Sequence, residues 1–241
     1  MTELGPVTWP PAPITTERLV LRESEARDRA AFIELFASPE VRTYLGGPRP
    51  RDELERAVPD LPGRRPGLFV VELDGVMIGM TTLDRRDAER PGHVLPDAGE
   101  AELGYMFLPE AWGCGYAAEA CAAALGWFAD ALPGEPVVLC TQTANDRSMR
   151  LAAKLGFTEV QRFEEWGVEQ WFGVWPLVTP RLSPCWRGAV CQLSWGRSSV
   201  TSRRRPAFLS WAGEPKRSSR ARTAGGLAAG PGPSPARGGS V

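Results

Sequence analysis

One stretch of the sequence, residues 103–120, constrains the fold more than any other. It reads Leu-Gly-Tyr-Met-Phe-Leu-Pro-Glu-Ala-Trp-Gly-Cys-Gly-Tyr-Ala-Ala-Glu-Ala. The first part is typical of a buried strand, and Gly-x-Gly is typical of a tight turn. The Ala-rich run, which continues to Ala131, is typical of a long helix. At such a junction the first helical N–H groups lack internal acceptors and carry the positive end of the helix dipole. The pattern therefore predicts a turn that can bind an anion such as a pyrophosphate.

The Gly-x-Gly turn by itself leaves a second interpretation open. No Gly-Lys-Ser/Thr follows it, as a Walker phosphate loop requires, and the third glycine of a dinucleotide fingerprint is absent. Gly113 and Gly115 also suit a turn that only packs a strand closely against a helix. The residues around the turn have to decide between the two interpretations.

Apolar periodicity and turn residues predict a mixed α+β domain around this turn. Asp74-Gly75 between two apolar runs is a strong hairpin signal, because both turn positions must accept positive φ. Asn145 is a typical N-cap, and Gly156 a typical end of the helix that follows it. The order of elements, β-ααα-β-β-β-α-β-α-β-β, indicates an α+β sheet domain. We expect strands at 14–22, 68–73, 76–83, 100–108, 136–141, 157–163 and 169–175, and helices at 27–37, 39–44, 51–58, 115–131 and 145–155.

Charge and composition divide the chain near residue 179. Residues 1–179 contain 17 basic and 28 acidic side chains, whereas residues 180–241 contain 11 basic side chains and one acid, Glu214. We therefore expect a Pro-rich leader at 1–13, a folded domain at 14–178, and a basic, low-complexity, disordered tail at 179–241. An extended or shifted reading frame is the favoured explanation of the tail. There are two alternatives. The tail could contact RNA or the ribosome through its arginines together with Trp195 and Trp211, or it could fold back onto the acidic body.

The remaining composition excludes several classes of protein. No stretch reaches the roughly 18 apolar residues of a membrane span, and the N-terminus lacks a signal-peptide pattern, so we expect a cytoplasmic protein without membrane contact. Five cysteines without a Cys-x-x-Cys pair predict neither a disulfide framework nor a zinc site. His93, the one histidine, lies in a Pro- and Gly-rich loop, so neither a Ser-His-Asp triad nor a metal site is expected.

Three segments together resemble the GCN5-related N-acetyltransferase (GNAT) superfamily. They are the strand 102–108, the turn 112–120, and the pattern Asn145…Ser148…Leu155-Gly156-Phe157. The opening Thr-Thr-Glu-Arg-Leu-Val-Leu-Arg at 15–22 is similar to the start of the branch with the ribosomal-protein alanine acetyltransferases, RimJ and RimL. The resemblance covers 14–176. It implies a mixed, mostly antiparallel sheet that splays open at its fourth strand, and an enzyme that moves an acetyl group from acetyl-CoA to a primary amine.

The resemblance also implies where acetyl-CoA binds. Its pyrophosphate would rest on backbone amides of the turn, and its pantetheine arm would pair with the backbone of the fourth strand. Asn145 would help to hold it. The residues implied are Met106, Phe107 and Leu108 for the arm, and Gly113, Cys114, Gly115, Tyr116 and Ala117 for the pyrophosphate.

The same resemblance implies a division of chemical labour. The amine must lose its proton before it attacks, and Glu102 would act as the base, directly or through water. A backbone N–H near Met106 would stabilise the oxyanion, and Ser148 would hydrogen-bond the sulfur as the thiolate leaves. No metal and no covalent enzyme intermediate are needed.

Apart from the resemblance, the aromatic residues around the last two expected strands fit the core and the sheet face. One of them, Trp166, with neighbouring Glu165 and Glu164, also fits a residue that lines the acceptor cleft, where acidic side chains would attract a cationic amine.

Structural interpretations and departures from the family pattern stand beside these roles. Glu102 also fits a solvated strand residue, whereas Asn145 and Ser148 fit ordinary first-turn residues of a helix. Trp112 stands where the superfamily commonly has Gln or Arg, and Cys114 where a cation is common between the two glycines. Ala152 stands where many members have a tyrosine that acts as the general acid. The remaining candidates for the acid are therefore Ser148 and solvent.

The sequence leaves the acceptor open. A protein N-terminal α-amine and a small-molecule amine both fit, the latter including acceptors of the aminoglycoside type. A non-catalytic acyl-CoA-binding module is the main alternative to an enzyme, and an RNA-associated protein that uses the basic tail is a second. A monomer and a homodimer are both compatible with the sequence.

Overall fold

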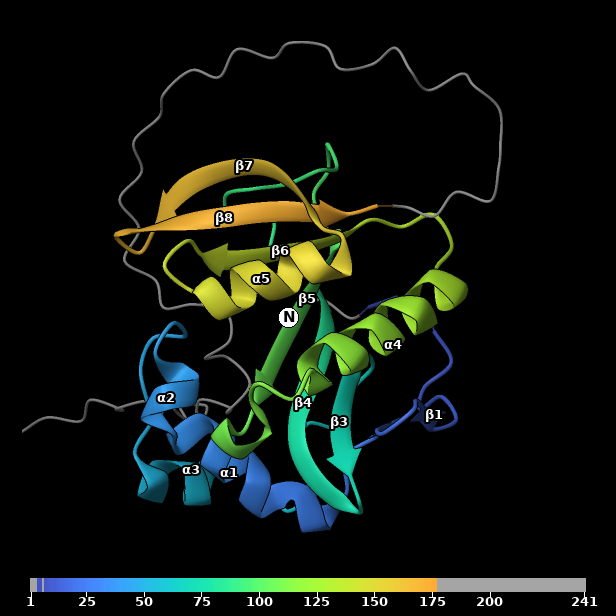
Figure 1. Ribbon diagram of the computed structural model, residues 1–241, viewed down its shortest axis with the longest axis vertical. Coiled ribbons are helices and arrows are strands. Elements are labelled where there is room, and N and C mark those ends of the chain that lie inside the picture. Colours follow the sequence, from blue (N-terminus) through green and yellow to red (C-terminus); the bar gives the residue numbers. More distant parts are fainter. Residues whose placement is uncertain (1–3, 6, 177–241) are drawn as a thin grey trace, which may run out of the picture.

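A single sheet of eight strands organises residues 4–5 and 7–176, the part of the chain that this computed structural model describes (Figure 1). The strands follow each other across the sheet in the order β1-β2-β3-β4-β5-β6-β8-β7. Their bounds are β1 (Ile14–Thr15), β2 (Val20–Arg22), β3 (Leu68–Leu73), β4 (Val76–Arg85), β5 (Ala101–Phe107), β6 (Val137–Gln142), β7 (Thr158–Glu165) and β8 (Val168–Trp175).

The sheet is antiparallel at every pairing except one, and that pairing is short. β5 and β6 run parallel and pair only at Ala101 with Val137 and at Glu102 with Val138. Beyond these residues the two strands diverge, so one edge of β5 is left without a neighbouring strand. The mixed α+β sheet that splays open at the fourth expected strand is thereby confirmed, because the expected strand 100–108 corresponds to β5.

Helices cover both faces of the sheet. They are α1 (Arg29–Ala37), α2 (Pro39–Arg42), α3 (Arg51–Ala57), α4 (Tyr116–Ala131) and α5 (Asp146–Leu155), with 3₁₀ turns at Ala26–Asp28 and Pro109–Ala111. Alternate residues of a strand face opposite sides of the sheet. Accordingly Phe69 and Val71 pack in the cluster that includes α4, whereas Leu68 and Val70 pack in the cluster that includes α1 and α3.

The first expected strand, 14–22, is wrong in one respect, because it is a hairpin of β1 and β2 in which Ile14 pairs with Leu21. The chain reverses where the Thr16 N–H donates to the Leu19 carbonyl, 2.9 Å away, so alternating apolar residues here belong to two strands. Other boundaries shift by two residues or fewer.

The predicted leader packs onto the domain where it is described. Leu4 is buried, and the Trp9 ring lies 5.0 Å from the ring of Phe69 and 5.7 Å from that of Trp127, in edge-to-face contacts. The predicted tail, with Trp195, Trp211 and the basic clusters, lies outside the described residues.

Gly67 offers a test of the packing between β3 and β4. Its φ is +83°, and a Cβ placed there would overlap the Leu83 carbonyl oxygen. We expect Gly67→Ala to lower the free energy of unfolding by about 2–4 kcal/mol, from backbone strain plus the clash. Gly134→Ala is the matched control, since its φ is +85° but nothing lies within 4 Å of the added carbon. Urea unfolding should show a loss of about 1 kcal/mol for the control. Equal losses would mean that the approach to Leu83 is not tight.

Candidate active site

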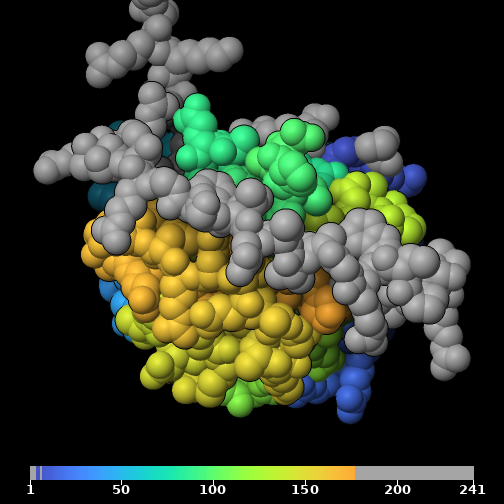
Figure 2. Space-filling view, turned by 90° about the horizontal axis from the view of Figure 1, so that it is seen from above, coloured from blue at the N-terminus to red at the C-terminus, as the bar shows by residue number. Residues whose placement is uncertain are grey.

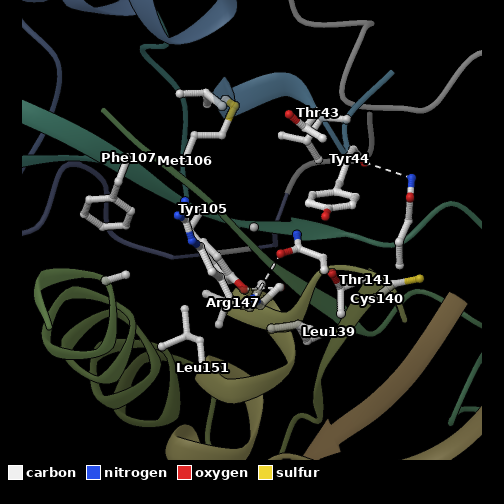
Figure 3. Close-up of a pocket in the computed structure, with 18 of the residues that line it drawn as sticks. Thr43, Tyr44, Tyr105, Met106, Phe107, Leu139, Cys140, Thr141, Arg147 and Leu151 are labelled. Atoms are coloured by element: carbon white, nitrogen blue, oxygen red, sulfur yellow. Dashed lines mark hydrogen bonds between the residues drawn. The ribbon is translucent and has the colours of Figure 1, made fainter. Parts of the chain in front are cut away.

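The divergence of β5 and β6 opens a cavity of about 1480 Å³. Its walls come from β5, the turn before α4, β6, α5, the loop after α2, and the turn between β7 and β8. Figure 3 shows Tyr105, Met106 and Phe107 along β5 on one side of this space, with Arg147 and Leu151 of α5 and Leu139 of β6 on other sides. Segments far apart in sequence therefore meet at the splayed part of the sheet.

The glycine turn presents backbone amides to the cavity. Gly113 and Gly115 have φ of +81° and +82°, a conformation that L side chains rarely adopt. The first hydrogen bonds of α4 run from the N–H groups of Ala118 and Glu119 to the Gly115 carbonyl. The amides of Tyr116 and Ala117 precede these bonds and lie where an anion could accept from them. Of the predicted cofactor residues, those lining the cavity are Met106, Phe107, Gly113, Gly115, Tyr116, Ala117 and Asn145, whereas Leu108 and Cys114 do not line it.

Arg18 braces this turn from the start of the domain. Its Nη1 donates to the Cys114 carbonyl at 3.0 Å, and its Nε donates to the Glu119 carboxylate at 2.8 Å. The guanidinium also lies over the Tyr116 ring, 4.6 Å from the centroid. The opening segment that resembles the family thus has a structural role, because it fixes the turn against α4.

A cationic side chain from another element lies beside the turn. Arg147 of α5 lies over the Trp112 ring, 4.4 Å from its centroid, and lines the cavity. Arg150 and Lys154 line the same cavity, one and two turns further along α5. The sequence carried a signal for this basic face, since residues three and four apart share one side of a helix.

Trp112 also orients the backbone of β5. Its indole Nε1 donates to the Phe107 carbonyl at 2.8 Å. The Leu108 N–H donates to Ile78 of β4, and backbone groups alternate between the two edges of a strand. The Met106 N–H therefore points toward β4, and the Phe107 N–H points toward the splay. Of the backbone N–H groups near Met106, where the oxyanion donor is predicted, that of Phe107 is the one that faces the splay.

Ser148 is held by contacts on both sides. Its backbone N–H donates to Asn145 Oδ1 at 3.2 Å, which is the cap contact expected from the sequence. Its hydroxyl is hydrogen-bonded to the hydroxyl of Tyr105, and both residues line the cavity. Burial raises the pKa of Tyr105 above its usual value, so its hydroxyl stays protonated. Sequence analysis missed Tyr105, since no local pattern relates residues 43 positions apart.

Glu102 is an ion-paired residue and not a solvated one. Arg86 Nη1 lies 2.8 Å and Arg90 Nη1 3.2 Å from the same carboxylate oxygen, Oε2. Burial alone would lower the pKa of Arg90, but the Glu102 and Glu165 carboxylates raise it above its usual value. Both arginines direct their hydrogen bonds to Oε2, which leaves Oε1 of Glu102 as the oxygen for an amine or a water.

The predicted acceptor residues have different positions. Trp166 is 42% exposed, lines the cavity, and has Arg90 over its ring at 5.1 Å. Glu165 does not line the cavity and instead holds Arg90 through two contacts of 3.2 and 3.1 Å. Figure 2 shows the loop that carries Arg90, in green, beside the β7–β8 hairpin, in orange. Arg90 thus joins Glu102 to the β7–β8 turn.

Two further lining residues, Gln142 and Tyr44, are joined by a hydrogen bond. Gln142 Nε2 at the end of β6 donates to the Tyr44 carbonyl at 3.2 Å, as the dashed line at Tyr44 in Figure 3 shows. Glu40 and Glu164 line the same cavity. His93 lies outside the lining, and its ring nitrogens contact Glu100 at 3.0 Å and the Arg90 carbonyl at 2.8 Å.

The described residues contain no cluster of three or more His, Cys, Asp or Glu side chains that could hold a metal ion. Within the same ranges, none of the helices is long and apolar enough to cross a membrane.

Comparison with known proteins agrees with this geometry. Residues 18–158 match the model of the acetyltransferase (GNAT) domain. The uncharacterized protein YkkB of Bacillus subtilis (strain 168) is 29% identical over 160 residues, which is 64% of this chain and 89% of YkkB. The uncharacterized N-acetyltransferase YoaA of the same strain is 28% identical over 150 residues, 60% of this chain and 81% of YoaA. A GNAT-family acetyltransferase from Bacillus anthracis shares the fold, with a TM-score of 0.56 and 22% identity. The match covers 67% of this chain and 96% of the Bacillus anthracis chain.

The ion pairs of Glu102 generate a prediction about stability. Glu102→Gln leaves Arg86, which is fully buried, and Arg90 without their shared carboxylate. We expect the free energy of unfolding to fall by about 3 kcal/mol, the usual result of removing one partner of a buried pair. Exposed Glu110→Gln is the charge-matched control and should change it by less than about 0.5 kcal/mol. If both variants unfold at the same urea concentration as the parent, the pairs contribute nothing, and loss of activity in Glu102→Gln reports chemistry alone.

Proposed function

The chain belongs to the GNAT acetyltransferase family, and we propose that it transfers the acetyl group of acetyl-CoA to a primary amine by direct attack of that amine. The observation that supports this proposal most is the single cavity at the splay. It combines an anion-binding turn and a basic helix face at one end with a carboxylate, Glu102, between β5 and the β7–β8 turn. Donor and acceptor can therefore meet beside the open edge of β5.

The residues present fit the phosphates and the extended arm of CoA. The amides of Gly113, Gly115, Tyr116 and Ala117 and the guanidinium of Arg147 offer donors for the pyrophosphate. The edge of β5 beyond Glu102 pairs with no strand in the described chain. Apart from the Phe107 carbonyl, which accepts from Trp112, its N–H and C=O groups are therefore open to an extended amide chain. When bound there, acetyl-CoA supplies the activated acetyl group.

The acceptor would reach this edge from the other side of the cavity. Tyr44, Trp166 and the acids Glu40 and Glu164 line that side, and acidic side chains attract the ammonium form of an amine. Glu102 Oε1 would take the proton, directly or through water, because only the neutral amine has a free lone pair. The Phe107 N–H would then stabilise negative charge on the carbonyl oxygen.

These residues are compatible with two classes of acceptor. Both a protein N-terminal α-amine and a small-molecule amine, including one of the aminoglycoside type, fit an acidic entrance of this kind. The two ion pairs of Glu102 and the alanine at 152 also support one competing proposal, an acyl-CoA-binding module without catalysis.

Turnover of acetyl-CoA by the full chain tests the proposed function. We would measure thiol release with a panel of N-terminal peptides, polyamines and aminoglycosides. Ser148→Ala should lower kcat about 100-fold, since it removes the hydroxyl placed to stabilise the leaving sulfur. Thr143→Ala, which removes an exposed hydroxyl just before α5, should retain the parental rate. Saturable CoA binding without amine-dependent thiol release would favour the binding module, and the absence of both would reject the assignment of the cavity.

Arg147 provides a separate test of the donor end. We expect Arg147→Gln to raise the KM for acetyl-CoA about tenfold with little change in kcat, because a charged hydrogen bond to the pyrophosphate is lost in ground and transition states alike. Arg56→Gln, on α3, is the charge-matched control and should leave this KM unchanged. An unchanged KM in Arg147→Gln at low salt would show that the turn amides bind the phosphates alone.

A further inference from the structure

Tyr105 and Ser148 form a pair of hydroxyl groups that meet across the splay. Tyr105 comes from β5 and Ser148 from the first turn of α5, and their hydroxyl oxygens are hydrogen-bonded. Ser148 is 7% exposed, and both residues line the cavity. In the part of the chain that is described, no other hydrogen bond to either hydroxyl is recorded.

The chemistry of the two hydroxyls sets the direction of this hydrogen bond. A phenol is a much stronger acid than an alcohol, so it is the better donor, and the alcohol oxygen is the better acceptor. Tyr105 therefore donates to Ser148 Oγ. The hydrogen of Ser148 is then free to point elsewhere, and the other space beside it is the cavity.

A tyrosine in this position is notable because α5 has none of its own. Ala152 follows Ser148 by one helical turn on the same face and is buried without a polar group. The phenol near this face of α5 comes instead from β5, a different element. Its ring packs against the core cluster that includes Ala152, so the fold holds the hydroxyl in place.

We propose that Tyr105 is a positioning residue that aligns the Ser148 hydroxyl to donate a hydrogen bond to the sulfur of CoA. This inference rests on the proposed function, since it assumes that CoA occupies the cavity. When the carbon–sulfur bond breaks, its electron pair stays on sulfur, and the thiolate accepts the hydrogen bond from Ser148. Tyr105 gives up no proton in this step, so no tyrosinate is formed. The thiolate takes its proton from solvent after it leaves.

The polarised pair should strengthen the interaction most when sulfur is charged. A hydrogen bond from an alcohol to a thiolate is stronger than one to a thiol, and Tyr105 increases it by drawing electron density from Ser148 Oγ. Because burial raises the pKa of Tyr105, the phenol still donates at the alkaline pH at which a thiol ionises. The affinity for CoA relative to a CoA analogue without sulfur should therefore rise with pH.

A binding measurement tests the pair without any turnover. Calorimetry would compare CoA with desulfo-CoA at pH 7 and at pH 9.5, above the roughly 8.5 at which an ordinary thiol ionises. At pH 9.5 we expect the parent to bind CoA about tenfold more tightly than desulfo-CoA. The Tyr105→Phe variant should bind CoA about threefold more tightly than desulfo-CoA, and the Ser148→Ala variant should bind the two ligands with equal affinity. Equal affinity of the parent for both ligands would overturn the proposal. So would a Tyr105→Phe variant whose affinities for CoA and for desulfo-CoA fall by the same factor.

Kinetics of a double-mutant cycle provide the second test. Tyr105→Phe should lower kcat about tenfold with KM for acetyl-CoA nearly unchanged, and it should have no further effect in a Ser148→Ala background. The same tenfold loss in both backgrounds would show that Tyr105 acts only through packing. Thr143→Ala serves as the hydroxyl control, and thermal unfolding verifies that each variant is folded.

The two tests separate this inference from the proposed function. A sulfur preference that disappears in Ser148→Ala, together with no amine-dependent turnover, would uphold the pair and reject the enzyme. Turnover by a parent protein that shows no sulfur preference would uphold the enzyme and reject the pair.

Discussion

The brief parallel contact between β5 and β6 is the constraint on which the site depends. Two residues of each strand pair, and the strands then separate, so the sheet itself contains an open edge. On one side of that edge the chain turns through two glycines into α4, and on the other it turns at Asn145 into α5. Both helices therefore begin at the splay, with their first amides and dipoles directed toward it. A continuous sheet would have closed this space.

Charges around the splay are distributed between its two ends. In the proposed function, the donor end has Arg147 and the basic face of α5, whereas the acceptor side has acids and one arginine-bound carboxylate. Glu102 is tied to Arg86 and Arg90, and Arg90 in turn to Glu165. This network links Glu102 to the β7–β8 turn, so a change at that turn would alter the surroundings of Glu102. If Glu102 is the base, as proposed, the same carboxylate serves both stability and chemistry.

Much of the fold could be predicted from local patterns. The hairpin at Asp74-Gly75, the Asn145 cap and the Gly156 stop are where the sequence indicated them, because each depends on the φ or hydrogen bonding of a few adjacent residues. The start of the domain was harder. A run of alternating residues fits one long strand and two short ones equally, and only the hydrogen bond from Thr16 to Leu19 selects the hairpin.

The sequence by itself determined the glycine turn, the helix caps and the alternation of the strands, and with them the family. Only the tertiary structure decided which side chains meet. Tyr105 reaches Ser148 across 43 residues, and Arg147 reaches Trp112 from a different helix. The physical reason is that backbone preferences act over a few residues, whereas contacts between side chains depend on sheet register and on how each helix docks. At this splay, those two quantities are set by the packing of the whole domain.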